Sequence, residues 1–111
     1  KKLRPLREQG ILIIGSGNIV HNLRVFNFEQ TKPYDWATVF DQMVKICILQ
    51  KDYAALCNYS SFGQMAELSI PTAEHYMPLL YVLALQQESD SLEFFNEEVM
   101  SSISMRSLQI G

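Results

Sequence analysis

The sequence Ile11-Leu12-Ile13-Ile14, followed by Gly15-Ser16-Gly17-Asn18, decides which fold is expected for this chain. Its apolar run is short, mostly β-branched and bounded by glycine on both sides. A run of that kind, without polar alternation, is typical of a strand that is buried on both faces of a sheet. Because such strands occur in parallel sheets covered by helices, the sequence predicts an α/β fold with a mostly parallel sheet flanked by helices.

The segment after this run is predicted to carry a ligand site. In parallel sheets, ligands bind in the crevice beyond the carboxyl ends of the strands, where the Gly15–Asn18 loop and His21 are expected to lie. A nucleotide-binding fingerprint is rejected, because Val20 stands at the position of the third glycine and no acidic residue follows a second strand at the required distance. His21 is therefore the residue of interest in this segment.

The middle of the chain predicts helices. Asp35 is expected to cap a helix with an apolar stripe that belongs to the core, made of Trp36, Val39, Phe40, Met43, Val44, Cys47 and Ile48. Short helices are expected over residues 52–59 and 62–68, and a loop is expected over residues 25–34.

The last third of the chain predicts one buried helix and a closing pair of strands. The helix is expected over residues 72–87, and it either kinks at Pro78 or begins there, because proline cannot donate a hydrogen bond within a helix. Strands are expected over residues 92–95 and 103–110, with a bulge or bend at residues 106–107. The adjacent residues Glu97 and Glu98 are expected to be solvated.

Length and composition indicate one small domain or a piece of a larger one. The chain has 111 residues, of which 48% are hydrophobic, and it begins with Lys1 instead of methionine. Residues 1–8 have the pattern of the last turns of an amphipathic helix whose beginning lies upstream. No linker, repeat or low-complexity tract divides the chain. We therefore expect residues 1–111 to form the C-terminal fragment of one domain, with no internal boundary.

Charge and cysteine content narrow the class of protein. Formal charge is +3 over residues 1–50 and −6 over residues 51–111, and the basic excess lies at one helical end without interleaved aromatic residues. A nucleic-acid surface is therefore not expected, and no apolar run approaches the roughly eighteen residues that a membrane span needs. Cys47 and Cys57 have no second pair and no signal peptide accompanies them, so we expect free, buried thiols in a cytoplasmic protein.

His21 and His75 are the two histidines of the chain, and each lies in a segment with the character of a site. Imidazole is a common metal ligand and the usual proton carrier near neutral pH. Because a catalytic metal takes about three protein ligands and keeps one position open, two histidines are expected to form only part of a centre. Taken from the residues alone, hydrogen-bonded core positions are the competing interpretation for both.

Three segments of the chain resemble a known family. They are Gly15-Ser-Gly-Asn-Ile-Val-His-Asn-Leu-Arg24, Pro71-Thr-Ala-Glu-His-Tyr-Met-Pro-Leu-Leu80 and Ser102-Ile-Ser-Met-Arg-Ser-Leu-Gln-Ile-Gly111. Together with Tyr34-x-Trp36-Ala37, they resemble the C-terminal part of the bacterial and plant 4,5-DOPA extradiol dioxygenases, which are class III ring-cleaving enzymes. The resemblance runs over nearly the whole chain, and it places two separated histidine motifs in the same order.

The resemblance implies a single α/β domain, much longer than this chain, whose metal centre also uses histidines from an N-terminal half that this sequence does not contain. It implies ring opening of catechol-type substrates such as DOPA with O2 and one non-haem Fe(II) or Zn(II) per complete domain. His21 corresponds to an active-site histidine that serves as ligand or as general base. His75 corresponds to the other C-terminal histidine of the metal centre.

Further roles are expected around these histidines. Asn18, Asn22 and Glu74 are expected to orient the rings as neighbours of the ligands. Arg24 is expected to meet a substrate carboxylate or to form a structural ion pair.

The expected partners are a catechol-type small molecule, O2, and a complementary N-terminal chain or a second copy of the fragment. The isolated fragment is expected to be inactive, because half of the metal ligands would be missing. Two alternatives stay open: a non-catalytic relative of the same fold that binds a metal or a partner protein, and a plain structural domain in which both histidines are hydrogen-bonded core residues.

Overall fold

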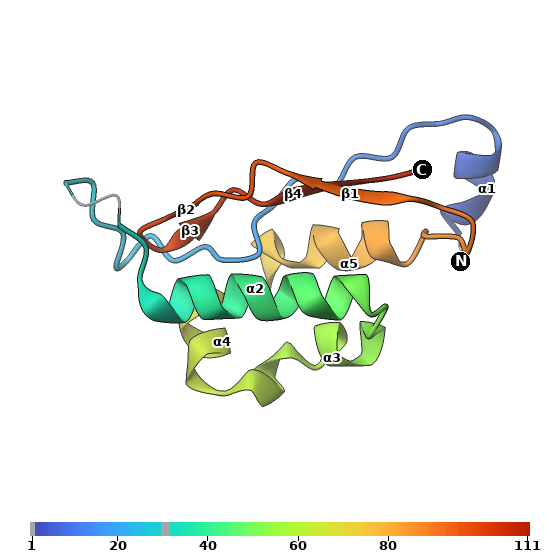
Figure 1. Cartoon of the computed structure of the whole chain (residues 1–111). Helices are drawn as coiled ribbons and strands as arrows, with labels where there is room; N and C mark the ends of the chain where they lie inside the picture. Colours follow the sequence, from blue (N-terminus) through green and yellow to red (C-terminus); the bar gives the residue numbers. More distant parts are fainter. Residues whose placement is uncertain (1, 30–31) are drawn as a thin grey trace.

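The computed structural model describes residues 2–29 and 32–111, and it consists of short helices below a layer of antiparallel strands (Figure 1). Lys1 and residues 30–31 of the expected loop lie outside the described residues. In chain order, the helical elements are α1 (Arg4–Glu8), α2 (Asp35–Leu49), α3 (Tyr53–Cys57), η1 (Tyr59–Phe62), α4 (Gln64–Ser69), η2 (Ala73–His75) and α5 (Met77–Leu83). The strands are β1 (Leu92–Phe95), β2 (Val99–Met100), β3 (Ile103–Ser104) and β4 (Ser107–Ile110).

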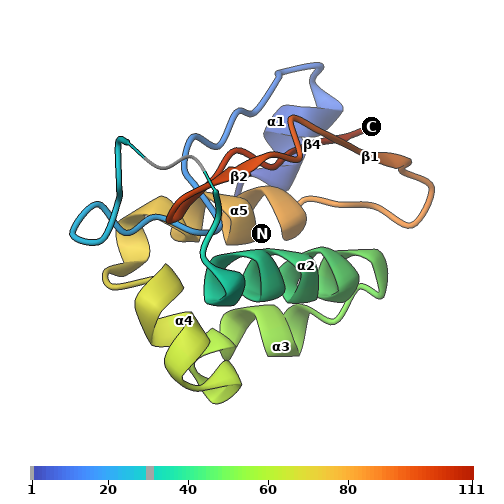
Figure 2. The same cartoon turned by 60° about the vertical axis from the view of Figure 1, so that its left-hand side comes forward.

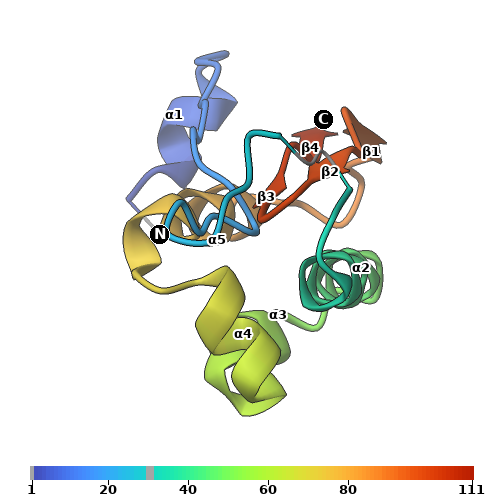
Figure 3. The same ribbon diagram turned by 90° about the vertical axis from the view of Figure 1, so that its left-hand side faces the viewer.

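The expected mixture of helices and strands is confirmed, but the expected mostly parallel sheet is wrong for the described part of the chain. β1 pairs with β4 and β2 pairs with β3, and both pairs are antiparallel. The strands form one layer, and α2 and α5 lie beneath it, while α3 and α4 lie farther away (Figures 1 and 3). Both pairs belong to one interrupted antiparallel hairpin, in which β1 and β2 run out to the turn at residues 101–102 and β3 and β4 run back.

The expected buried strand at residues 11–14 is also absent from the described structure. Residues 11–18 run as an irregular segment in no strand ladder. Leu12 and Ile14 expose 81% and 79% of their surface, and Ile11 exposes 46%. Two-sided burial requires a neighbouring strand as well as covering helices, and none of the described strands pairs with this segment. The β-branched composition favours a strand, but these residues pair with no strand in the described structure.

α2 forms the centre of the core, as its apolar stripe predicts. Phe40, Val44 and Ile48 are almost fully buried, and the helix packs against α3 and α4 on one side (Figure 2). Tyr34 holds the cap position with an extended backbone, and Asp35 stands in the first turn, so the expected cap is displaced by one residue. An acidic residue in that turn still favours the helix, because it faces the positive end of the helix dipole.

The region around Pro78 resolves the two alternatives for the following helix. A short 3₁₀ turn, η2, ends at His75, and α5 begins at Met77 with the proline in its first turn. The helix therefore begins in the turn that contains the proline, where a missing N–H costs nothing. It is less buried than expected: Leu83 is buried, but Tyr81 exposes 59% of its surface.

The expected closing strands are present, but the bend lies one residue earlier than expected and β2 was not predicted. β1 occupies residues 92–95, and the tail is divided into β3 and β4 by an interruption at residues 105–106.

Of the two thiols, Cys47 is buried but Cys57 is exposed, so the expectation of burial is wrong for Cys57. Both are free. Across residues 2–29 and 32–111, the structure contains no helix that is both long and apolar enough to cross a membrane.

Candidate functional site

The two histidines lie against one another, although they are 54 positions apart in the sequence. The ring centroids of His21 and His75 are 3.7 Å apart, and the ring planes are inclined by 22°. Both side chains are partly exposed. Because metal–imidazole bonds are about 2.0–2.1 Å long, imidazoles in contact can present nitrogen atoms to one ion, whereas rings held far apart cannot.

His21 is fixed because its segment is hydrogen-bonded on both sides. Its backbone N–H donates to the Ser69 carbonyl at 2.9 Å, and it forms an isolated antiparallel bridge with Ile103. The neighbouring Val20 carbonyl accepts from the Ser104 N–H at 3.0 Å. The segment thus runs between the end of α4 and β3, and this placement sets the direction of the His21 side chain.

His75 is held next to His21 by a close approach of two backbones. The Asn18 N–H donates to the His75 carbonyl at 2.7 Å. A Cβ atom on Gly17 would lie only 2.1 Å from that carbonyl oxygen, and one on Gly15 would lie 3.0 Å from the Pro78 carbonyl oxygen. These two glycines are therefore required by close contact between two segments of the chain, because a side chain at either position would push residues 15–18 away from residues 75–78.

The residues expected to orient the histidines do not contact the imidazole rings through the hydrogen bonds they form, and the two asparagine side chains bind backbone carbonyls instead. Asn18 donates through its side chain to the Ser104 carbonyl at 2.8 Å, and Asn22 donates to the Leu68 carbonyl at 2.8 Å. Glu74 accepts from the Thr72 hydroxyl at 2.5 Å and lies exposed beside the pair. Arg24 is exposed, and its backbone N–H donates to the Asn22 side chain at 3.2 Å. The asparagines thus secure the two segments and not the rings themselves.

The electrostatics of the pair favour a neutral imidazole at His21. Burial lowers the pKa of His21 below its ordinary value, and the charge of the adjacent His75 lowers this pKa further. A neutral imidazole has a free lone pair, which both a metal ligand and a general base require. The pKa of Glu74 is lowered by the Thr72 hydrogen bond and, to a smaller degree, by the nearby histidines. The carboxylate therefore stays charged beside the pair.

A buried ionic cluster supports β3 and β4 directly behind the histidine segment. Arg106 donates through Nε and Nη2 to Asp41 Oδ2 at 3.0 and 2.7 Å, and the Ser104 hydroxyl donates to Asp41 Oδ1 at 2.5 Å. Arg106 also donates to Glu97, which accepts from Lys45 at 2.7 Å as well. Glu97 is exposed as expected, but it is ion-paired and not merely solvated.

Sequence reasoning did not identify this cluster or the role of the glycines. The partners Asp41 and Arg106 are 65 positions apart, and nothing in their local sequence points from one to the other. Gly17 carried a detectable signal, because a glycine next to a histidine motif permits close backbone approach. The sequence instead predicts a loop at the end of a parallel strand at this position.

The pair fits a metal centre only in part. Two imidazoles are suitable donors for Fe(II) or Zn(II). Within residues 2–29 and 32–111, no group of three or more His, Cys, Asp or Glu side chains comes together to hold a metal ion. The described residues thus offer two ligands where a catalytic centre takes about three.

Comparison with known proteins agrees with the resemblance. The chain is 40% identical over its whole length to the 4,5-DOPA dioxygenase extradiol of Escherichia coli K12, of which it covers 42%. The chain is a relative of the 4,5-DOPA extradiol dioxygenases. The corresponding proteins of Mirabilis jalapa and Portulaca grandiflora are 35% and 31% identical over 71% and 84% of the chain, which covers 30% and 35% of their lengths. No family model matches.

The fold of this 4,5-DOPA extradiol dioxygenase relative is shared with a solved structure. An uncharacterized protein of Escherichia coli K12 superposes on 99% of the chain with a TM-score of 0.88 and 39% sequence identity, and the chain covers 47% of it. The chain therefore spans less than half the length of each of these relatives, consistent with the C-terminal part of the family.

Proposed function

We propose that this chain contributes two ligands to the metal centre of an extradiol ring-cleaving dioxygenase. The single observation that carries the proposal is the contact between His21 and His75, whose ring centroids are 3.7 Å apart. Relatives named as 4,5-DOPA dioxygenase extradiol indicate the reaction class. The substrate is a catechol-type aromatic such as DOPA, the second substrate is O2, and the ion is Fe(II) or Zn(II).

The residues of this chain have defined tasks in that reaction. When bound, the metal acts as a Lewis acid that favours deprotonation of the catechol and brings the two substrates together. The lowered pKa of His21 keeps its imidazole neutral near pH 7, so it is suited to take a hydroxyl proton or to bind the ion. Asn18 and Asn22 hold the segment of His21 at fixed places on the backbone. The remaining ligands come from polypeptide that corresponds to the unmatched part of the relatives.

The test uses this chain co-expressed with the remaining part of the Escherichia coli 4,5-DOPA dioxygenase extradiol. We expect the complex to retain about one Fe(II) or Zn(II) and, with iron, to consume O2 in the presence of DOPA. His21→Ala and His75→Ala are expected to lose most of the metal and the turnover. Glu88→Ala is the matched control, because this exposed residue follows the C-terminal end of α5, whereas His75 precedes the start of that helix.

The outcomes separate the competing interpretations. Metal content and turnover that are unchanged in both histidine variants would contradict the proposal and support a structural role for the pair. Metal lost without any turnover in the parent complex would support a non-catalytic, metal-binding relative. Tight stoichiometric Fe(II) binding with O2 consumption by the isolated 111 residues would contradict the claim that the chain supplies only part of the centre.

A further inference from the structure

The helix α2 carries a second apolar face in addition to the one that it buries in the core. The apolar residues on the core side are Ala37, Phe40, Val44, Cys47 and Ile48. The second side, which we call the open face of α2, consists of Trp36, Val39, Met43 and Ile46. Val39 and Ile46 expose 48% and 49% of their surface, so the expected core position is wrong for Val39. Apolar side chains on two sides of one helix indicate two packing partners.

The spacing of the open face is that of a contact between two helices. Its residues follow one another at intervals of three, four and three positions. This repeat keeps the side chains on one line along a helix and lets them pack between the side chains of a second helix. The open face therefore has the pattern of a surface that packs against another helix along its length.

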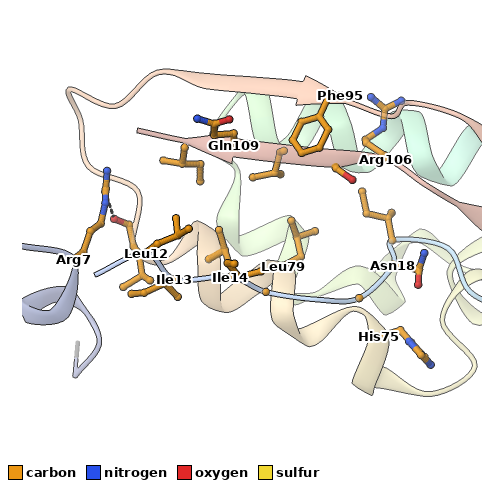
Figure 4. A pocket seen from close by; sticks show the side chains of 18 of the residues that line it. Arg7, Leu12, Ile13, Ile14, Asn18, His75, Leu79, Phe95, Arg106 and Gln109 are labelled. Atoms are coloured by element: carbon orange, nitrogen blue, oxygen red, sulfur yellow. Dashed lines mark hydrogen bonds between the residues drawn. The ribbon is translucent and has the colours of Figure 1, made fainter. Parts of the chain in front are cut away.

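The open face lies apart from the other apolar surface of the molecule. The described elements that pack against α2 include α3, α4 and β3, and Figure 3 shows α2 at the margin of the molecule, on the side away from α1 and residues 11–17. An apolar groove of about 580 Å³ runs beside residues 11–17, and no residue of α2 lines it (Figure 4). The two surfaces can therefore be tested separately.

Exposed charges at the two ends of α2 are arranged symmetrically about its middle. Asp35 begins the helix and Lys51 follows its end, and each lies eight positions from Met43. Both side chains are exposed, and neither takes part in an ion pair among the described residues. A second α2 that runs in the opposite direction would bring a lysine to the acidic end and an aspartate to the basic end. The helix is thus complementary in charge to its own reversed copy.

We propose that the open face of α2 is an interface between two copies of this chain, which pack their α2 helices antiparallel across a two-fold axis near Met43. In this arrangement Val39 of one copy lies opposite Ile46 of the other, and the symmetry repeats the contact. Asp35 of each copy lies beside Lys51 of the other. A segment of unrelated sequence would match the apolar spacing without matching the order of the charges.

The size of this interface predicts a reversible dimer. α2 has 15 residues, which correspond to a length of about 22 Å. One helix pair of this length buries less than the roughly 1,200–2,000 Å² of a standard stable interface, so association is expected to depend on concentration. The interface does not include the histidines. The proposal can therefore fail while the proposed function survives, and the reverse also holds.

The first experiment is sedimentation velocity of the chain over a wide range of concentrations, which is expected to show a monomer–dimer equilibrium. Ile46→Asp is expected to weaken the dimer by about tenfold or more, because each copy would bury an unpaired carboxylate at the contact. Ile14→Asp is the matched control. It places the same charge at a side chain that is 79% exposed and lines the groove beside residues 11–17 (Figure 4), so it should leave the equilibrium unchanged.

Charge reversal tests the antiparallel arrangement. Asp35→Lys and Lys51→Asp are each expected to weaken the dimer by about twofold to tenfold, because each puts like charges together at both ends of the interface. The double variant is expected to recover the parent equilibrium, since it restores opposite charges at both ends. Aspartate suits position 51, where φ is 54°, because it tolerates the left-handed conformation.

Three outcomes would contradict the proposal. One is a chain that stays monomeric at all concentrations. Another is a dimer that Ile14→Asp dissociates and Ile46→Asp does not, because association would then use the groove. The third is a double charge variant that stays as weak as the single variants. Thermal unfolding of each variant shows that it is folded, and recovery in the double variant cannot arise from loss of folding.

Discussion

Two adjacent pieces of one extended segment differ in how many backbone hydrogen bonds they form and in how deeply their side chains are buried. Residues 18–22 are hydrogen-bonded to β3, α4 and the His75 turn, and Ile19, Val20 and Asn22 are buried. Residues 12–17 are mostly apolar or glycine and largely exposed, and they form no backbone hydrogen bond with the described residues. The difference teaches that the described residues secure the histidine end of the segment, whereas they leave the backbone of the preceding apolar end without hydrogen bonds.

The largest loss of stability is expected when the Asp41 carboxylate, which supports the hydrogen-bonded end of the segment (residues 18–22), is removed. This carboxylate is fully buried and holds both Arg106 and the Ser104 hydroxyl. Asp41→Ala leaves a buried guanidinium with too few acceptors, so we expect a loss of about 3–5 kcal/mol in the free energy of unfolding, measured by urea denaturation. Lys45→Ala removes only a half-exposed partner of Glu97 and should cost less than about 1 kcal/mol. Equal losses in the two variants would contradict the importance of the buried cluster.

A paired truncation compares the two ends directly. Ile19 exposes 5% of its surface and Ile14 exposes 79%. Ile19→Ala is expected to lower the free energy of unfolding by about 2–5 kcal/mol because it opens a cavity in the core. Ile14→Ala is expected to change it by no more than about 0.5 kcal/mol in the chain alone. A similar cost at both positions would show that residues 11–17 are already packed in solution.

Gly17→Ala tests the junction between the two ends. The added methyl group would lie 2.1 Å from the His75 carbonyl oxygen, so the two backbones must separate. We expect a loss of about 1–3 kcal/mol in stability and a change in the imidazole resonances of both histidines, followed by NMR. Ser16→Ala, at an exposed neighbouring position, is the control and should leave those resonances in place. Unshifted resonances in Gly17→Ala would disprove the positioning role.

The smallest effect is expected at the ion pair between Arg7 and Asp90, because Arg7 lies just before residues 11–17 in the chain. Arg7 donates to both carboxylate oxygens of Asp90 at 2.5 and 2.6 Å, and this lowers the pKa of Asp90 from 3.8 to about 2. A lowered carboxyl pKa contributes stability that is complete above the unfolded value and is lost as the pH falls toward the folded value. The difference in unfolding free energy between the parent chain and Arg7→Gln should therefore shrink between pH 4 and pH 2. A constant difference over that range would contradict this assignment.

The sequence predicts best what depends on local periodicity. The stripe from Trp36 to Ile48 identifies α2, and the proline at position 78 marks the start of α5, because helix formation is decided within a few turns. It predicts less well what depends on distant partners. Residues 11–14 have the composition of a buried strand, but burial depends on a neighbouring strand, and none of the described strands pairs with them.

The candidate site shows the same division. Both histidine motifs are recognisable from sequence, but their contact is produced by Gly17, the His75 carbonyl and the bonds to α4 and β3. The ionic cluster behind them joins Asp41 of α2 to Arg106 of the tail, and no local sequence pattern predicts such a pair. Cys57 was expected in the core because it continues an apolar pattern, but it falls on the outer side of the short helix α3.

The hydrogen bond between the Asn18 amide and the His75 carbonyl, at 2.7 Å, has a consequence for engineering. This bond and the absence of a side chain at Gly17 set how far apart the backbone positions of His21 and His75 lie. That separation is therefore determined by the main chain. Replacing either imidazole with a carboxylate or a thiol would exchange the donor atoms while the anchors keep their spacing. The segment pair can thus serve as a fixed frame in which ligand chemistry is varied one atom type at a time.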